Sequence, residues 1–241
     1  MTVAEKIRQK VKTFESGKVF TYDDLDVDAS SEGAAKVALY RMVREGMIER
    51  LSKGRFYKPE KGITGNLRPD EYEMVKDLLY ANGKVTGYIT GYSVFNQLGL
   101  STQIPNIIQI GANFDKKQIK RGKYQIRFVR QWNRITEDNI KFLQLLDCIR
   151  FIKIIPDTTV DEAFVRLFNL VEGMTGQELE ALAGLAMNYP SSARALTGAM
   201  LQRTEREDLA AGLRKSLKVS SHYKIPISDY ILPNKANWKI K

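Results

Sequence analysis

A glycine-bracketed stretch at residues 45–62 (EGMIERLSKGRFYKPEKG) constrains the fold more than any other feature of the sequence. It contains two short runs typical of extended backbone, separated by Ser52, Lys53 and Gly54. Because glycine adopts positive φ angles without steric cost, these three residues suit a tight turn. Pro59 then ends the second run, since proline has no backbone N–H to donate. The stretch therefore predicts a β-hairpin with a basic tip.

Three helical segments are expected before this hairpin. Apolar residues recur at helical spacing over residues 3–15 and again over residues 32–45. A shorter helix is expected over residues 21–25, and Ser30 and Ser31 offer a cap for the helix that follows them. The order of helix, short helix, longer helix and hairpin predicts a winged helix-turn-helix.

The charge pattern of this segment predicts one basic face. Its acidic residues come early, at 23–28, and its basic residues come late. In a winged helix the third helix enters the major groove of DNA and the hairpin tip lies against the backbone or minor groove. We expect contacts to double-stranded DNA from Ser30, Ser31, Lys36, Tyr40, Arg41, Arg44, Lys53 and Arg55. The alternative is a dimerisation or docking module whose surface lysines are merely solvated.

The bulk composition is that of a globular protein, and its basic charge favours an anionic partner. The chain has 241 residues, of which 43% are hydrophobic and 27% charged, and this is enough to bury a core. Its net charge of +10 favours binding to a polyanion. No apolar run approaches the roughly 20 residues of a membrane helix, and no signal-peptide block begins the chain. A single cysteine, Cys148, is typical of a reducing cytoplasm, so we expect a cytoplasmic protein with no membrane contact.

A second domain is expected after a boundary at residues 61–69, where glycines and a proline cluster. The winged helix would then occupy residues 1–62 and a larger mixed α/β domain residues 66–241. Strand-like runs are expected in the first part of that domain, and helices follow from Thr136 onward. The expected fold class is therefore α+β, with the second domain ending in a helical bundle.

Local signals place several elements in the second domain. A helix is expected over residues 70–81, a helix over 91–98 capped by Thr90, and a hairpin over 118–130. Residues 229–241 are too apolar for a free tail, so we expect them to pack against the domain. Three helices are expected to begin with capping boxes, at Thr159, Thr175 and Thr204.

The densest basic block in the sequence lies between residues 116 and 134, with eight basic residues and no acidic residue. It predicts a second surface for an anion or a partner, and a solvated charged face is an equally open interpretation. The candidate residues are Lys116, Lys117, Lys120, Arg121, Lys123, Arg127 and Arg130.

The sequence lacks the motifs of common enzymes. His222 is the only histidine, which argues against both a zinc site of nitrogen and sulfur ligands and a serine-type triad. Neither GxxxxGKS nor GxGxxG occurs, and the paired carboxylates fall at predicted helix starts, where the helix dipole accounts for them. We therefore expect no catalytic residue, metal or cofactor. A nuclease-like enzyme steered by the basic block is the remaining enzymatic alternative.

Residues 87–105 (GYITGYSVFNQLGLSTQIP) resemble the N-x-L-G-L-S-T-Q-x-P block of the AbiEi-like antitoxins. That family belongs to the type IV toxin–antitoxin and abortive-infection systems of prokaryotes. Residues 46–59 are similar to the family's wing. The segment PSSARALTG at 190–198, and the closing residues from Leu232 to Trp238, are also similar to family segments.

The resemblance implies a protein of two parts without a catalytic motif. The winged helix of such antitoxins represses its own promoter, and the C-terminal domain antagonises a nucleotidyltransferase-like toxin, directly or indirectly. Contact candidates in the resembling block are Asn96, Ser101, Thr102 and Gln103, although a structural turn explains them equally well. The alternative is a winged-helix transcription regulator whose C-terminal domain senses a small ligand.

Overall fold

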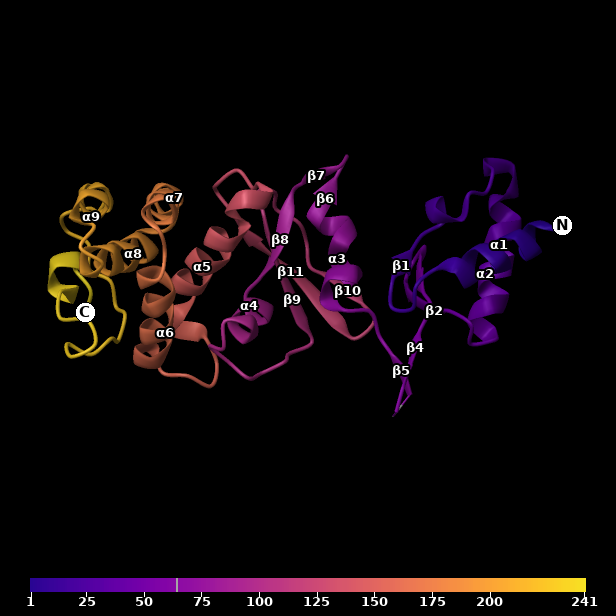
Figure 1. Cartoon of the computed structure of the whole chain (residues 1–241), viewed down its shortest axis with the longest axis horizontal. Coiled ribbons are helices and arrows are strands. Elements are labelled where there is room, and N and C mark those ends of the chain that lie inside the picture. Colours follow the sequence, from indigo (N-terminus) through magenta and orange to yellow (C-terminus); the bar gives the residue numbers. More distant parts are fainter. Residues whose placement is uncertain (64) are drawn as a thin grey trace. The chain divides into compact units, whose positions relative to one another are not determined.

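Helices and small sheets begin the chain, a mixed sheet follows, and helices end it, so the expected α+β fold class is confirmed (Figure 1). The computed structural model describes residues 1–63 and 65–241. Thr64, which lies in the segment expected to be a domain boundary, is outside the described residues. Contacts divide the chain into two units, one of residues 1–78 with 120–124 and one of residues 79–119 with 125–241.

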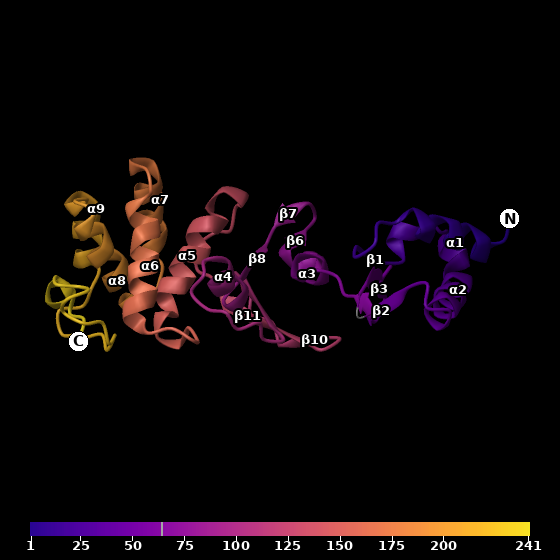
Figure 2. The ribbon, with the colours of Figure 1, turned by 60° about the horizontal axis from the view of Figure 1, so that its bottom comes forward.

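The first unit begins with the element order of a winged helix, as the sequence predicts. The elements are α1 (Val3–Thr13), β1 (Val19–Phe20), a 3₁₀ turn at Asp23–Leu25, α2 (Glu32–Arg44), β2 (Glu49–Ser52) and β3 (Arg55–Tyr57). The three strands form an antiparallel sheet in the order β1-β3-β2. Helices α1 and α2 pack against each other in this unit (Figure 2). Ile7, Leu39, Met42, Ile48 and Phe56 are buried in its core.

The expected serine cap of α2 is wrong. Ala29–Ser31 form a 3₁₀ turn, and Ser31 occupies the N-cap position without a side-chain hydrogen bond to the helix. Its φ of −99° and ψ of 3° lie outside the extended region in which a capping hydroxyl reaches the first-turn amides. The backbone N–H of Ser31 donates instead to the carbonyl of Asp28, at 2.8 Å.

The segment expected to be a domain boundary forms a second hairpin. Strand β4 (Glu60–Gly62) pairs antiparallel with β5 (Gly65–Leu67), and helix α3 (Glu71–Leu79) follows. Asn66 donates to the Glu49 carboxylate at 2.8 Å, and a Glu73 carboxylate oxygen accepts from the backbone N–H of Val19, also at 2.8 Å. These bonds tie the hairpin and α3 to the winged helix, which is why the first unit extends to residue 78.

The central sheet has the strand order β10-β11-β9-β8; its residues belong to the second unit, except residues 120–124 at the β10–β11 hairpin, which belong to the first. These strands are β8 (Gly87–Thr90), β9 (Ile107–Ala112), β10 (Ile119–Arg121) and β11 (Tyr124–Arg130); β6 (Tyr80–Ala81) and β7 (Lys84–Val85) form a separate hairpin. Strand β9 runs parallel to β11 and antiparallel to β8. The hairpin expected over residues 118–130 is confirmed.

Helix α4 (Tyr92–Gln97) lies where a helix is expected, but Thr90 does not cap it. Gly91 is the N-cap, with a φ of 65° that favours glycine. The Thr90 hydroxyl donates to the carboxylate of Asp147, at 2.8 Å, in a buried environment. A polar residue before a helix therefore serves a tertiary contact here.

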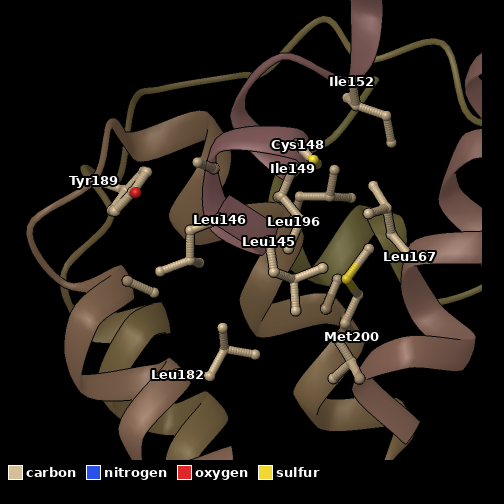
Figure 3. Close-up of a cluster of buried hydrophobic side chains, with 14 of the residues drawn as sticks. Leu145, Leu146, Cys148, Ile149, Ile152, Leu167, Leu182, Tyr189, Leu196 and Met200 are labelled. Atoms are coloured by element: carbon tan, nitrogen blue, oxygen red, sulfur yellow. The ribbon is translucent and has the colours of Figure 1, made fainter. Parts of the chain in front are cut away.

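Helices build the C-terminal half, as expected. They are α5 (Ile140–Arg150), α6 (Val160–Glu172), α7 (Gly176–Ala186), α8 (Ser191–Arg203) and α9 (Glu207–Lys215). Figure 3 shows part of their shared core, in which Leu145 of α5, Leu167 of α6 and Leu196 and Met200 of α8 lie in one buried cluster. Apolar burial of this extent is the main stabilising contribution to the unit.

Two of the three expected capping boxes are confirmed. The Thr159 and Thr175 hydroxyls accept from backbone N–H groups at the starts of α6 and α7. The third expectation is wrong, because the Thr204 hydroxyl donates to the Leu201 carbonyl and α9 begins after Arg206. The closing segment does pack against the unit, since Trp238 is fully buried and its indole N–H donates to Gln202.

Candidate nucleic-acid interface

Helix α2 has one face in the core of the winged helix and one face in solvent. Its buried residues are Ala35, Ala38, Leu39 and Met42. The opposite stripe follows helical spacing through Gly33, Val37, Tyr40 and Arg44. Val37 is 51% exposed and Tyr40 is 64% exposed. The helix therefore presents large side chains to solvent on the face opposite its buried stripe.

Two arginines of α2 are available to a ligand. Arg41 and Arg44 are exposed, and among the described residues neither guanidinium has a hydrogen bond or an ion pair. The acidic residues at the helix ends have other partners, since Glu32 pairs with Lys36 at 2.6 Å and Glu45 with Arg8 at 2.5 Å. The ion pair raises the pKa of Lys36, so that side chain stays charged beside the helix.

The wing confirms the hairpin expected at the start of the sequence analysis. Gly54 has a φ of 73° in the turn between β2 and β3, and Lys53 beside it is exposed. Within the described part of the chain Lys53 has no ion pair. Arg50, which the sequence analysis does not include among the candidates, is also exposed on this hairpin and donates through Nε to the Ser52 carbonyl.

A groove separates α2 from the wing. The volume of this groove is about 710 Å³. The lining residues are Tyr22, Glu32, Lys36, Tyr40, Val43, Arg50, Lys53, Gly54 and Phe56. Three of them are cations and three are aromatic. The position of Arg50 in the sequence gives little indication that it lines this groove, because the groove arises from the packing of the hairpin against α2.

A groove between a recognition helix and its wing lies where a DNA backbone passes in a winged-helix complex. Cations at its rim suit phosphates, which carry most of the affinity for DNA. The arrangement of α2, groove and wing is therefore a candidate surface for duplex DNA.

Arg55 is not a free cation of the wing tip, contrary to expectation. Its Nη2 donates to a carboxylate oxygen of Asp77, at 2.5 Å, and the side chain is only 30% exposed. Arg121 donates to the same carboxylate at 2.6 and 2.8 Å and also to the Met74 carbonyl. Burial favours the neutral acid, but the two guanidinium groups outweigh it and hold the pKa of Asp77 below its usual range.

Comparison with known proteins assigns a family but no activity. Residues 6–177 match the model of a family of unknown function, DUF6088. The chain belongs to this family. The crystal structure of the RV2827C protein from Mycobacterium tuberculosis is similar over 92% of this chain and 84% of that chain, with a TM-score of 0.60 and 16% sequence identity. At that identity the likeness shows the fold alone. A search of curated proteins found no match.

The basic block of this DUF6088 chain is not one uniform surface. Arg121 is 4% exposed, so its expected place on an anion-binding surface is wrong. Residues 120–124 belong to the first unit and the rest of the block to the second. The other candidates are exposed, and four have contacts: Lys116 over Phe128, Lys123 over Tyr124, Arg127 with Gln125 and Arg130 with Asp115. Lys117 and Lys120 have no contact of these kinds among the described residues.

The LGLSTQ block forms a turn at the edge of a cleft. Asn96 donates to the carbonyls of Tyr92 and Gln103, and the Ser101 hydroxyl accepts from the backbone N–H of Gln103. The Gln103 side chain donates to Asp157 at 2.8 Å. Ser101 and Thr102 line a cleft of about 920 Å³ in the second unit. The hydrogen bonds of Asn96 and Ser101 thus stabilise this turn, while Thr102 is exposed.

A buried carboxylate lies between the central sheet and the helices. Asp147 is fully buried and accepts from the hydroxyls of Tyr88, Thr90 and Tyr189 at 2.7, 2.8 and 3.1 Å. Gln131 donates to both tyrosine oxygens. Burial raises the pKa of Asp147. Every group in this network has a partner, and none lines the cleft described above. The network therefore has a structural role, which is to hold the sheet against α5.

The described residues contain no group of three or more histidine, cysteine or carboxylate side chains placed to hold a metal ion. Among their helices, none has the length and apolar character that crossing a bilayer requires.

Proposed function

We propose that this chain is a winged-helix repressor that binds its own promoter and acts as the antitoxin of a type IV toxin–antitoxin system. The observation that carries the DNA-binding part is the solvent face of α2. Arg41 and Arg44 are exposed there without an ion pair to any described residue, and the groove beside them has a basic rim.

The physical basis is the division of labour in DNA recognition. Contacts to phosphates supply affinity that depends on salt, and contacts to base edges supply specificity. In this proposal Lys53 at the wing tip, which is exposed, would contact phosphates, and Arg41, which is exposed on α2, would make a bidentate contact to guanine. Lys36 and Arg50 line the groove between them and add positive potential along the same path.

The antitoxin part rests on the resemblance of residues 87–105 and 46–59 to AbiEi-like antitoxins. The antagonised protein would be a nucleotidyltransferase-like toxin, opposed through direct contact or by an indirect route. The two activities would belong to different parts of the chain, so variants of α2 separate them.

The test is colony survival during induction of any nucleotidyltransferase-like gene found beside the gene of this protein, measured together with a promoter reporter. Full-length protein should restore growth and repress the reporter. The Arg41→Ala, Arg44→Ala double variant should lose repression and still restore growth. Failure of the full-length protein to restore growth would contradict the antitoxin role, and reporter repression by the double variant would contradict the role of α2.

A ligand-sensing regulator is the second candidate, and the cleft of the second unit favours it. Its volume of about 920 Å³ lies within the range of small-molecule sites. Its lining includes carboxylates and one arginine, Arg166, together with apolar side chains such as Val165 and Leu170. A metabolite that raises the melting temperature and changes promoter affinity, in a protein that gives no growth rescue, would favour this alternative.

A further inference from the structure

The solvent face of α2 has an apolar side chain at its centre, where a base-reading residue would stand. Val37 is 51% exposed and has no hydrogen-bonding group. It lies one helical turn after Gly33 and one turn before Tyr40 and Arg41. An exposed valine side chain makes no hydrogen bond with water, so contact with an apolar partner would be favourable.

Resting on the proposed function, we infer that Val37 reads the C5-methyl group of a thymine in the major groove of the promoter site. Thymine is the only base that presents a methyl group there, and apolar side chains recognise it by contact. Val37 has no donor or acceptor with which to read any other base edge. A thymine is therefore expected opposite the middle of α2.

The surroundings of Val37 allow a base pair to approach closely. Gly33 has no side chain, and a Cβ added there would meet nothing within 4 Å. Lys36, which precedes Val37, is held by Glu32 in an ion pair on the same helix. Arg44 lies at the C-terminal end of the stripe, where phosphates are nearer than base edges when the N-terminal part of the helix is inserted.

The test replaces each thymine of the footprinted promoter site by deoxyuridine, one at a time, and measures the dissociation constant of the full-length protein. At one or two positions, loss of the methyl group should weaken binding about fourfold, which corresponds to roughly 0.8 kcal/mol for one buried methyl-sized group. The Val37→Ala variant, whose shorter side chain makes less contact with the methyl group, should show a smaller difference between the thymine and deoxyuridine sites at those positions. Val219→Ala, a change at another highly exposed valine, should keep the full difference.

Equal binding of thymine and deoxyuridine sites by the wild-type protein at every position would overturn the inference. An undiminished difference in Val37→Ala would also overturn it, because another residue would then contact the methyl group. A wild-type protein that does not prefer the promoter to a random duplex would instead contradict the proposed function, and this result is distinct from the other two.

Discussion

Arg121 donates hydrogen bonds from Nη1 and Nη2 to the two carboxylate oxygens of Asp77, at 2.6 and 2.8 Å, and its side chain is 4% exposed. Arg55 of the wing donates to the same carboxylate. One residue of α3 thus joins the wing to the tip of the β10–β11 hairpin within the first unit. The wing is held by contacts outside its own hairpin.

Removal of Arg121 should destabilise the first unit. The Arg121→Ala variant leaves Asp77 with only one of its two cationic partners, and we expect a loss of about 2–3 kcal/mol, at or below the range for a fully buried pair. Lys120→Ala, at the exposed neighbouring position, should change stability by less than about 0.5 kcal/mol. Urea unfolding followed by circular dichroism measures both, and equal midpoints for the two variants would contradict the assignment.

The same carboxylate predicts a dependence of stability on pH. The pKa of Asp77 is lowered in the folded protein, so its stabilising contribution is present above the unfolded value of about 4 and is lost as the pH falls through the folded value. The wild-type protein should therefore be more stable than Asp77→Asn at pH 7. The gap should narrow as the pH falls from about 5 toward 2. Chemical unfolding across this series measures the gap, and a gap independent of pH would refute the prediction.

Two helical glycines should respond to alanine in opposite ways. A Cβ on Gly198 of α8 would lie 2.1 Å from a ring carbon of Trp238, whereas a Cβ on Gly184 of α7 would meet nothing within 4 Å. Gly198→Ala should destabilise the protein by about 1–3 kcal/mol through overpacking. Gly184→Ala should stabilise it by about 0.5–1 kcal/mol, since alanine favours helix more than glycine does. Thermal unfolding that shifts both variants in the same direction would contradict this packing.

The periodic parts of the fold could be predicted from the sequence. The apolar spacing of α2 and the turn glycine of the wing are local signals, and both elements occur where they are expected. Residues 61–69 show that glycine alone does not distinguish a boundary from a turn, because the glycines there lie in the hairpin of β4 and β5. The role of Thr90 is not predictable from local sequence, since a hydroxyl before a helix suits a cap and its tertiary partner Asp147 is far away in sequence.

The candidate site was predictable in its position and less so in its members. Helical spacing places Tyr40, Arg41 and Arg44 on the exposed side of α2 without any structure. Arg55 and Arg121 appeared as two of many basic residues, and only the fold brings both to Asp77. Charge counting cannot separate a cation that is paired from one that is available, because pairing depends on contacts distant in sequence.

The most direct test of the central claim is the affinity of the full-length protein for its promoter duplex across a salt series. Lys53→Ala should reduce the slope of log affinity against log salt by about 0.9, as expected for one lost phosphate contact. Arg41→Ala should weaken promoter binding by about 1–3 kcal/mol while affecting random duplex less. Lys218→Ala, at an exposed position of the second unit, is the control and should match wild type. Wild-type affinity and slope in both Lys53→Ala and Arg41→Ala would contradict DNA binding through α2 and the wing.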